Sequence, residues 1–272
     1  MKITTESITP KLAAQWLSEN NNHNRPIRTG HVNRLAEDMR EGRWNEDGSP
    51  FRFNVNGVLM DGQHRLHAIV KSGETVRNCV VIRGLPEDSF HTIDTGAKRS
   101  LSDVLNISGE KNHHTVSGAL VLLCEFLLTN KLGANGISYS TQQLLETLEA
   151  CPAIRESARI VSAARGRAKS ISISHKSLLP PSASVALHYL FSEKDSALAE
   201  VFVDGMATGY NNATHAAFHM LRERLVGNRM NTARLSKEYI CAVAIKAWNS
   251  ERTKKPLNHL RWSDAEDFPA IR

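Results

Sequence analysis

Residues 59–68 read LMDGQHRLHA, a polar stretch that follows a short apolar run and opens a helical pattern. The spacing after Gly62 predicts a helix of about eleven residues that stops near Gly73. A glycine at a strand-to-helix junction lets backbone N–H groups approach a ligand closely. Because a helix N-terminus also carries unpaired donors and the positive end of the helix dipole, this stretch predicts a site for an anion such as a phosphate.

The side chains around Gly62 add to that prediction. Arg65, in the first turn, can bind two phosphate oxygens at once, and His64 beside it can donate to a phosphate or carry a proton. Gln63 belongs to the same turn. Asp61 can hold Mg²⁺ or accept a proton from a hydroxyl group. In the structural alternative, Asp61 only caps the helix and Arg65 makes a surface ion pair, and the sequence leaves both interpretations open.

The flanking regions predict a small α+β unit, built from helices and a few short strands. Its signals are N-caps, apolar alternation and an Asn-Gly turn, which is the strongest short hairpin signal. In chain order they predict a helix from Thr9, a helix over about 30–41, a strand over 51–55, a turn at Asn56-Gly57, a return strand over 58–60, the helix after Gly62, a strand over 75–85 and a helix capped by Ser100 or Ser102.

After about residue 112 the pattern changes to helical periodicity throughout. Six segments show it: 116–130, 141–150, 183–191, 197–207, 216–226 and 236–249. We therefore expect about six helices between roughly 113 and 250, with a polar, basic connection over 166–182. The predicted domains are 1–112, a sheet-and-helix domain, and 113–272, a helical domain with basic stretches.

The net charge of +6 is concentrated in the C-terminal half. Residues 155–177 hold six basic residues against one acidic residue, and residues 222–261 hold ten against three. This separation suits a region that faces the phosphates of DNA, although two solvated helix faces would have the same composition. The predicted DNA-binding residues are Arg165, Arg167, Lys169, Arg222, Arg229 and Arg234.

Composition argues against a membrane protein and against a disulfide or zinc scaffold. There is no run of about 18 apolar residues, so no membrane partner is expected. The first residues lack the apolar stretch of a signal peptide, which predicts a cytoplasmic protein. The four cysteines are scattered without a C-x-x-C pair, which predicts reduced, mostly buried thiols.

The opening stretch also resembles a known motif. Gly62, Arg65 and Ala68 form G-x-x-R-x-x-A, which is similar to a box of the ParB/sulfiredoxin fold. DGQHR at 61–65 matches the signature of DGQHR-domain proteins of bacterial DNA-modification systems. NRPIR at 24–28 resembles the segment that opens ParB nucleotide-binding domains. The likeness covers about residues 20–110, and the remainder resembles helical tails of ParB-like proteins from phages and mobile elements.

A second ParB box, Glu-Asn-x-x-Arg-x-x-Leu, has its counterpart in IDTGAKRSL at 93–101. When Leu101 is aligned with the leucine of that box, Asp94 replaces the glutamate, Thr95 the asparagine and Lys98 the arginine. The sequence therefore departs from the ParB pattern at three functional positions of this box.

The resemblance implies a nucleoside triphosphate, ATP or CTP, bound with Mg²⁺ across the helix N-termini of the two boxes. It also implies association with DNA and pairing into a homodimer. The implied nucleotide- or phosphate-binding residues are Arg28, Gly62, Gln63, His64, Arg65, Thr95, Gly96 and Lys98. The implied catalytic residues are Asp61, His64 and Asp94, with Asp61 and Asp94 also as Mg²⁺ ligands.

The leading hypothesis is a ParB-like protein that binds and hydrolyses a nucleoside triphosphate and acts on or with DNA. One alternative is a kinase that phosphorylates a small hydroxyl compound or a modified base, with Asp61 as general base. A second is a metal-dependent DNase, and a third is a DNA-binding regulator whose nucleotide site has become structural. Sulfinic acid reduction is disfavoured because the box contains no cysteine.

Overall fold

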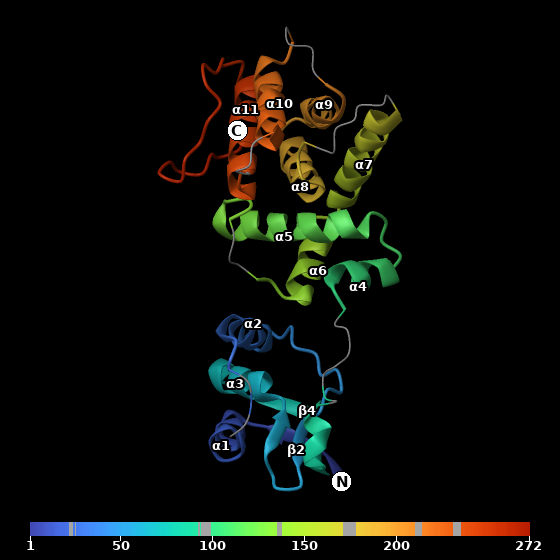
Figure 1. The fold of residues 1–272 in the computed structure, drawn as a ribbon, viewed down its shortest axis with the longest axis vertical. Coiled ribbons are helices and arrows are strands. Elements are labelled where there is room, and N and C mark those ends of the chain that lie inside the picture. Colours follow the sequence, from blue (N-terminus) through green and yellow to red (C-terminus); the bar gives the residue numbers. More distant parts are fainter. Residues whose placement is uncertain are drawn as a thin grey trace. The chain divides into compact units, whose positions relative to one another are not determined.

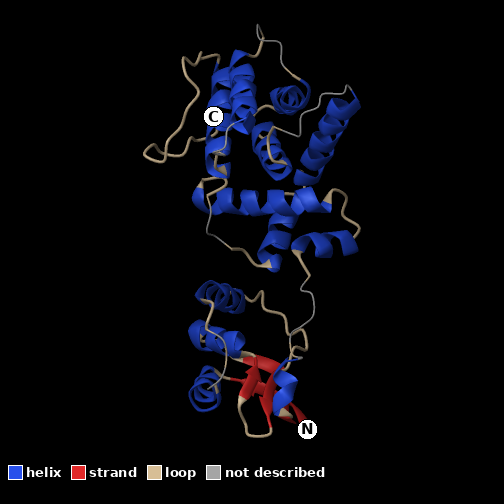
Figure 2. Ribbon diagram, viewed as in Figure 1, coloured by secondary structure: helices blue, strands red, loops and turns tan. Residues whose placement is uncertain are grey.

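The computed structural model describes residues 1–21, 24, 26–91, 93, 99–134, 138–170, 178–209, 214–230 and 235–272. In these ranges the chain forms eleven α-helices, one short 3-10 helix and a four-stranded mixed sheet (Figures 1 and 2). It divides into two compact units, Met1–Lys98 with Ser138–Gln143 and Arg99–Ile137 with Leu144–Arg272. The predicted combination of α and β structure is confirmed, whereas a ParB-like fold and the domain boundary at 112 stay predictions.

The sheet belongs to the first unit. Its strands are β1 (Lys2–Ile8), β2 (Phe51–Asn54), β3 (Leu59–Asp61) and β4 (Val76–Leu85), in the order β1-β4-β2-β3. β4 runs antiparallel to β1 and parallel to β2, and β2 and β3 form an antiparallel hairpin. The sequence predicted β2, β3 and β4 but not β1.

The predicted hairpin turn at Asn56-Gly57 is confirmed. The side-chain oxygen of Asn54 accepts hydrogen bonds from the backbone N–H groups of Asn56, at 2.9 Å, and Val58, at 2.8 Å. Gly57 has a φ of +77°, a conformation that glycine adopts without a steric penalty. The turn returns the chain directly into β3, so Asp61 lies beside the start of β2.

Three helices pack together beside the sheet: α1 (Pro10–Asn20), α2 (Thr29–Arg40) and α3 (Gln63–Ser72), with α3 in contact with both of the others (Figure 2). α1 begins as predicted, since the Thr9 hydroxyl accepts from the backbone N–H of Leu12. Trp16 of α1 makes edge contacts with Phe51 and Phe53 of β2. These contacts belong to one buried cluster that joins the three helices to the strands and holds the β3–α3 junction in place.

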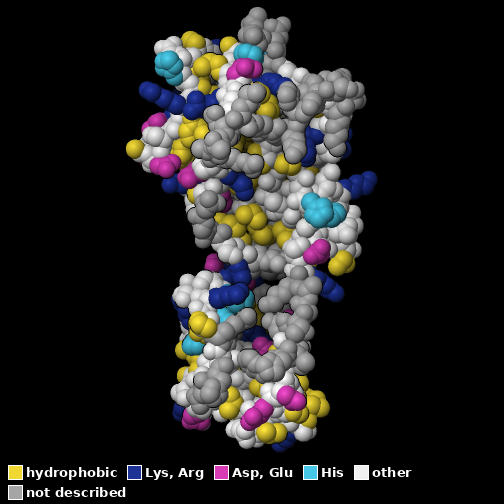
Figure 3. Space-filling view, in the orientation of Figure 1, with side chains coloured by type: hydrophobic (Ala, Val, Ile, Leu, Met, Phe, Trp, Pro, Cys, Tyr) yellow, Lys and Arg dark blue, Asp and Glu magenta, His cyan; other side chains and the backbone are white. Residues whose placement is uncertain are grey.

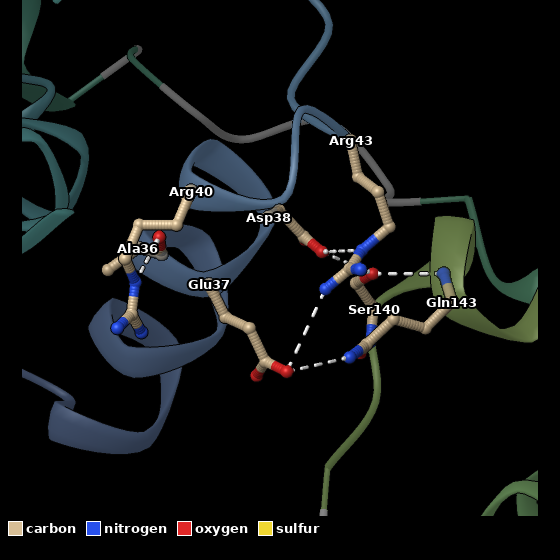
Figure 4. Close-up of polar contacts among 7 residues, drawn as sticks. All are labelled: Ala36, Glu37, Asp38, Arg40, Arg43, Ser140 and Gln143. Carbon is tan, nitrogen blue, oxygen red and sulfur yellow. Dashed lines mark hydrogen bonds and ion pairs between the residues drawn. The ribbon is translucent and has the colours of Figure 1, made fainter. Parts of the chain in front are cut away.

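A short segment from farther along the chain, Ser138–Gln143, packs on the C-terminal end of α2 within the same unit (Figure 4). The buried carboxylate of Asp38 accepts from Arg43 Nε and from the Ser140 hydroxyl, both at 3.0 Å. The Gln143 amide donates to Glu37 at 3.4 Å. These contacts satisfy the buried Asp38 charge, which would otherwise be costly, and fix the loop that follows α2.

The second unit is helical. After the 3-10 helix Glu87–His91 of the first unit, the helices are α4 (Leu101–Ile107), α5 (His113–Thr129), α6 (Thr141–Ala150, from Leu144 onward in this unit), α7 (Ile154–Ser170), α8 (Pro181–Ser192), α9 (Ser196–Thr208), α10 (Ala216–Met230) and α11 (Lys237–Thr253). Ser100 caps α4 with a capping box, as one of the two predicted caps. Among the described residues none of these helices is long and apolar enough to cross a bilayer.

One helix of this unit was not predicted. α7 covers most of the first basic stretch, so the description of 166–182 as a connection is wrong for residues 166–170, and also for residues 181–182, which begin α8. The buried face of α7 consists mainly of Ile154, Ala158, Val161 and Ala164. Because two of these are alanines, the apolar stripe is faint beside the many charges of this segment.

The core of the second unit is aromatic. The Trp248 ring of α11 stacks on the Phe191 ring of α8, with ring centroids 4.1 Å apart and planes 8° apart. Phe202 and Phe218 continue the cluster through edge contacts at 5.1 and 5.2 Å. All four rings are fully buried, so α8, α9, α10 and α11 share one packed interior.

Candidate functional site

The β3–α3 junction opens into a pocket of about 810 Å³ within the first unit. Most of its lining comes from α2, the loop between α2 and β2, and residues 60–65, and Asn24, Arg52 and Ile93 complete it. This volume lies within the range of about 300–1,000 Å³ that is usual for small-molecule sites. The pocket therefore places the polar stretch of residues 61–65 beside a cavity large enough for a nucleotide-sized ligand.

Gly62 is the residue that makes the junction possible. Its φ of +108° lies in the region that side-chain-bearing residues rarely adopt, and it is the N-cap of α3. A Cβ atom there would lie 2.5 Å from Cδ1 of Phe51. Because the N-cap is a glycine, it has no side chain that could accept from the first backbone N–H groups of α3, which lie at the pocket.

Arg65 lies on the pocket wall with its guanidinium group largely engaged. It stacks on the Phe51 ring at 4.5 Å, donates to the backbone carbonyl of Pro50 at 2.7 Å and donates to that of Ser49. Its side chain is 14% exposed and lies 3.5 Å from Asp61. Arg65 therefore ties the loop before β2 to α3 and also brings positive charge to the pocket.

Asp61 is not the N-cap of α3, because that position is Gly62. Its carboxylate accepts from Arg52 Nη1 at 2.7 Å and lies near Arg65. Arg52 and Asp61 are paired residues in the β2–β3 ladder. The pair is about 30% exposed on each side, so it contributes at most about 1 kcal/mol to stability.

His64 is 7% exposed and its Nε2 accepts from the backbone N–H of Arg28 at 3.1 Å. An accepting nitrogen carries no proton, so the His64 ring is neutral with its proton on Nδ1. The His31 ring of α2 lies 5.4 Å away, and Arg34 donates to its Nδ1 at 2.9 Å. His31 is therefore also neutral, with its proton on Nε2, because arginine can only donate.

Asp47 and Gln63 also line the pocket. Burial disfavours the ionised form of Asp47, but hydrogen bonds from the Ser49 hydroxyl and N–H and the nearby Arg65 charge outweigh it and lower the pKa of Asp47. Gln63 is buried and also lines the pocket. Two carboxylates, Asp47 and Asp61, thus face two guanidinium groups around one cavity.

The remaining residues of the predicted site are distributed differently. The predicted residues Asp94, Thr95, Gly96 and Lys98 lie outside the described residues. Arg28, the N-cap of α2, contacts the predicted site through its backbone N–H, which donates to His64. Within the described part of the chain, no group of three or more His, Cys, Asp and Glu residues is arranged to hold a metal ion.

Sequence reasoning missed several residues that line the pocket, among them His31, Trp44, Asp47, Ser49 and Arg52. Arg52 had a usable signal, because a two-residue turn at 56–57 sets residue 52 opposite residue 61. The others carry no local motif. They reach the pocket through the packing of α2 and its following loop on α3.

The DNA-binding candidates lie in the second unit and in part have internal partners. Arg167 of α7 pairs with Asp204 of α9 at 2.7 Å, and Arg222 of α10 donates to the Met206 carbonyl at 2.7 Å. Arg165 is half-buried on α7. On the face drawn in Figure 3, the basic side chains of the described helices are interspersed with hydrophobic and acidic ones. The predicted residues Lys169 and Arg229 lie in α7 and α10 with their side chains outside the description, and Arg234 lies outside the described residues.

Comparisons with protein-family models, with curated proteins and with solved structures found no significant match to this chain. Any functional argument therefore rests on the pocket and its residues. Fold-level likeness alone would not select a reaction in any case, since one fold supports many.

Proposed function

We propose that the pocket binds a nucleoside triphosphate, ATP or CTP, together with Mg²⁺, and hydrolyses it, in a ParB-like protein that acts on or with DNA. The observation that carries the proposal is the glycine-capped N-terminus of α3, whose residues 62–65 line a cavity of about 810 Å³. Backbone donors and the positive end of the helix dipole favour a phosphate at that position. Arg52 and Arg65 on the same wall add charge of the required sign.

The balance of charge in the pocket favours a metal–nucleotide complex over a bare anion. Asp47 and Asp61 offset the two arginines, so a triphosphate alone would meet little net positive charge. Carboxylate, hydroxyl and amide oxygens of Asp47, Asp61, Ser49 and Asn24 are the hard ligands that Mg²⁺ prefers. When bound, Mg²⁺ would neutralise phosphate oxygens and hold them in place.

The pocket lining also includes apolar side chains that suit the base or ribose. They are Leu35, Trp44, Met60 and Ile93. Burial of an aromatic base against these side chains would supply affinity that the phosphate contacts alone do not.

The hydrogen bonds restrict the roles open to the polar residues. The lone pair of His64 accepts from Arg28, so His64 can take a proton only by giving up that bond. Asp61 is the better candidate to orient or deprotonate the attacking water, because its contacts to Arg52 and Arg65 are partly exposed. Arg52, whose guanidinium contacts Asp61, is placed to exchange that contact for a phosphate oxygen.

Titration calorimetry with ATP, CTP, GTP and UTP in the presence of Mg²⁺ tests the binding. We expect a micromolar dissociation constant for at least one nucleotide, weakened about tenfold in Arg52→Gln because one charge-assisted hydrogen bond is lost. Arg77→Gln, an exposed arginine of β4, is the matched control and should bind like wild type. Absence of heat with every nucleotide, or an unchanged affinity in Arg52→Gln and in Arg65→Ala, would refute the proposal.

Hydrolysis and DNA binding need separate measurements. Asp61→Asn should keep nucleotide affinity within about threefold and abolish phosphate release, since the amide cannot accept a proton from water. Anisotropy of labelled duplex DNA should rise on adding protein and fall steeply with salt, because the predicted contacts are to phosphates. Unchanged phosphate release in Asp61→Asn would reject its catalytic role, and salt-independent anisotropy would reject the DNA contact.

A further inference from the structure

The outer strand of the sheet, β1, has an uncovered edge. In the order β1-β4-β2-β3 it pairs with β4 on one side only. Among the described residues, no backbone hydrogen bond joins its other side to another segment. Such an edge presents a row of N–H and C=O groups that a further strand can pair with, and globular proteins usually blunt or cover it.

The part of this edge that can pair regularly with a further strand is short. β1 pairs with β4 without interruption from Lys2, opposite Arg83, to Glu6, opposite Cys79. A register shift follows between Glu6 and Ile8, and such irregularities twist a strand away from further pairing. The regular edge is therefore Lys2–Glu6, and its middle residue is Thr4.

Charge is distributed unevenly along those five residues. Lys2, Thr4 and Glu6 lie on one face of the strand, since side chains alternate. Lys2 lies directly opposite Arg83, so two cations are neighbours across the ladder. Arg83 makes its ion pair with Glu6, at 2.5 and 3.1 Å. The edge is thus basic at Lys2, whose partner in the β1–β4 ladder is Arg83 and not an acid. It is acidic at Glu6, the other end.

We propose that a second copy of this chain docks on this edge, with the two β1 strands antiparallel about a two-fold axis at Thr4. In that register Lys2 of each copy lies opposite Glu6 of the other, which gives two symmetric ion pairs. Ile3, 59% exposed in the single chain, lies opposite Thr5 and loses solvent contact. The two sheets become one.

The register is specific to a second copy. If the axis moves to Ile3 or to Thr5, Lys2 lies opposite Thr4 or Ile8 and no opposite charges meet. The charge pattern and the midpoint of the regular edge therefore select the same residue, Thr4. This inference concerns the edge of the sheet and does not depend on nucleotide binding.

Sedimentation equilibrium of the full chain tests the proposal. Only one strand edge is buried, so we expect a reversible dimer with a dissociation constant on the order of 100 µM. Lys2→Glu should raise that constant about tenfold, because both ion pairs become like-charge pairs. Lys11→Glu is the matched control: it makes the same charge change at an exposed position of α1 and should leave the dimer unchanged.

A charge exchange provides the sharper test. The double variant Lys2→Glu, Glu6→Lys restores both intermolecular pairs, and the introduced acid lies opposite Arg83, which keeps an acidic neighbour. We expect its dissociation constant to return to within about threefold of wild type. A monomer at every concentration, a dimer insensitive to Lys2→Glu, or no recovery in the double variant with unchanged melting would each overturn the proposal.

Discussion

Both units bury polar side chains, but they arrange them differently. In the first unit the buried Asp38 and Asn54 close local contacts outside the pocket, but Gln63 and His64 line the same pocket as Asp61 and Arg65. In the second unit the buried polar groups are dispersed, and each closes one contact between two segments. Glu125 accepts from the N–H of Gly133, His188 contacts the Ser157 hydroxyl, and Glu251 accepts from the N–H of Ala217.

Burial of polar groups is therefore by itself no sign of a binding site. A satisfied buried polar group commonly fixes one packing arrangement. Convergence of several such groups on one cavity is the feature that indicates a ligand. On this criterion the pocket of the first unit is the candidate site, whereas the buried polar groups named above in the second unit belong to its helical scaffold.

The largest expected effect is in the scaffold. Trp248→Ala removes a fully buried ring that stacks on Phe191, and it should lower the free energy of unfolding by about 4 kcal/mol. Trp248→Phe keeps an aromatic ring there and should cost about 2 kcal/mol. Urea unfolding followed by circular dichroism measures both.

Trp248→Ala also tests the comparison. At a temperature where the variant stays folded, its nucleotide affinity should equal that of wild type, because Trp248 belongs to the other unit. A large loss of affinity in folded protein would contradict the view of the second unit as a separate scaffold.

The second-largest expected loss of stability is at the β3–α3 junction. Gly62→Ala forces a side chain into a positive φ and against Phe51, and it should cost about 3 kcal/mol. Gly73→Ala, at the other end of α3, meets no atom within 4 Å and should cost only about 1 kcal/mol for its positive φ. Thermal unfolding of the two variants gives the difference.

Nucleotide binding should separate the two glycine variants further. Since Arg65 stacks on Phe51, a displaced Phe51 also displaces the pocket wall, so Gly62→Ala should lose affinity and Gly73→Ala should not. Equal stability and equal affinity of the two variants would show that the junction is not under the steric constraint described.

The smallest effect concerns pH. Burial lowers the pKa of His188, against opposing contributions from Glu200 and Glu156. The unfolded chain therefore binds more protons than the folded chain below about pH 6.5. The stability from this residue is present above that pH and is lost as the pH falls toward the folded-state pKa.

His188→Asn removes the titration and keeps an amide near the Ser157 hydroxyl. Between about pH 7.5 and 5.5, wild type should lose stability relative to this variant, by at most about 1.4 kcal/mol per pH unit. Urea unfolding of both proteins at several pH values measures the difference. Parallel pH profiles would mean that His188 makes no contribution.

Much of the fold could be predicted because its causes are local. The Asn54–Val58 turn, the Thr9 cap and the Ser100 cap each depend on a few neighbouring residues. β1 was missed because KITTESI has no regular apolar alternation, and it is a strand through pairing with β4. α7 was missed because its buried face is rich in alanine.

The candidate site divides in the same way. The glycine junction and the polar first turn of α3 follow from local sequence, because a strand end, a glycine and a helix start lie within ten residues. The contacts of Arg65 and His64 depend instead on how distant segments pack. Those partners, the Ser49 and Pro50 carbonyls and the Arg28 N–H, lie 15 to 36 residues away in the chain. Packing of α2 and its following loop on α3 brings these partners next to Arg65 and His64. No local sequence signal predicts contacts between residues so far apart in the chain.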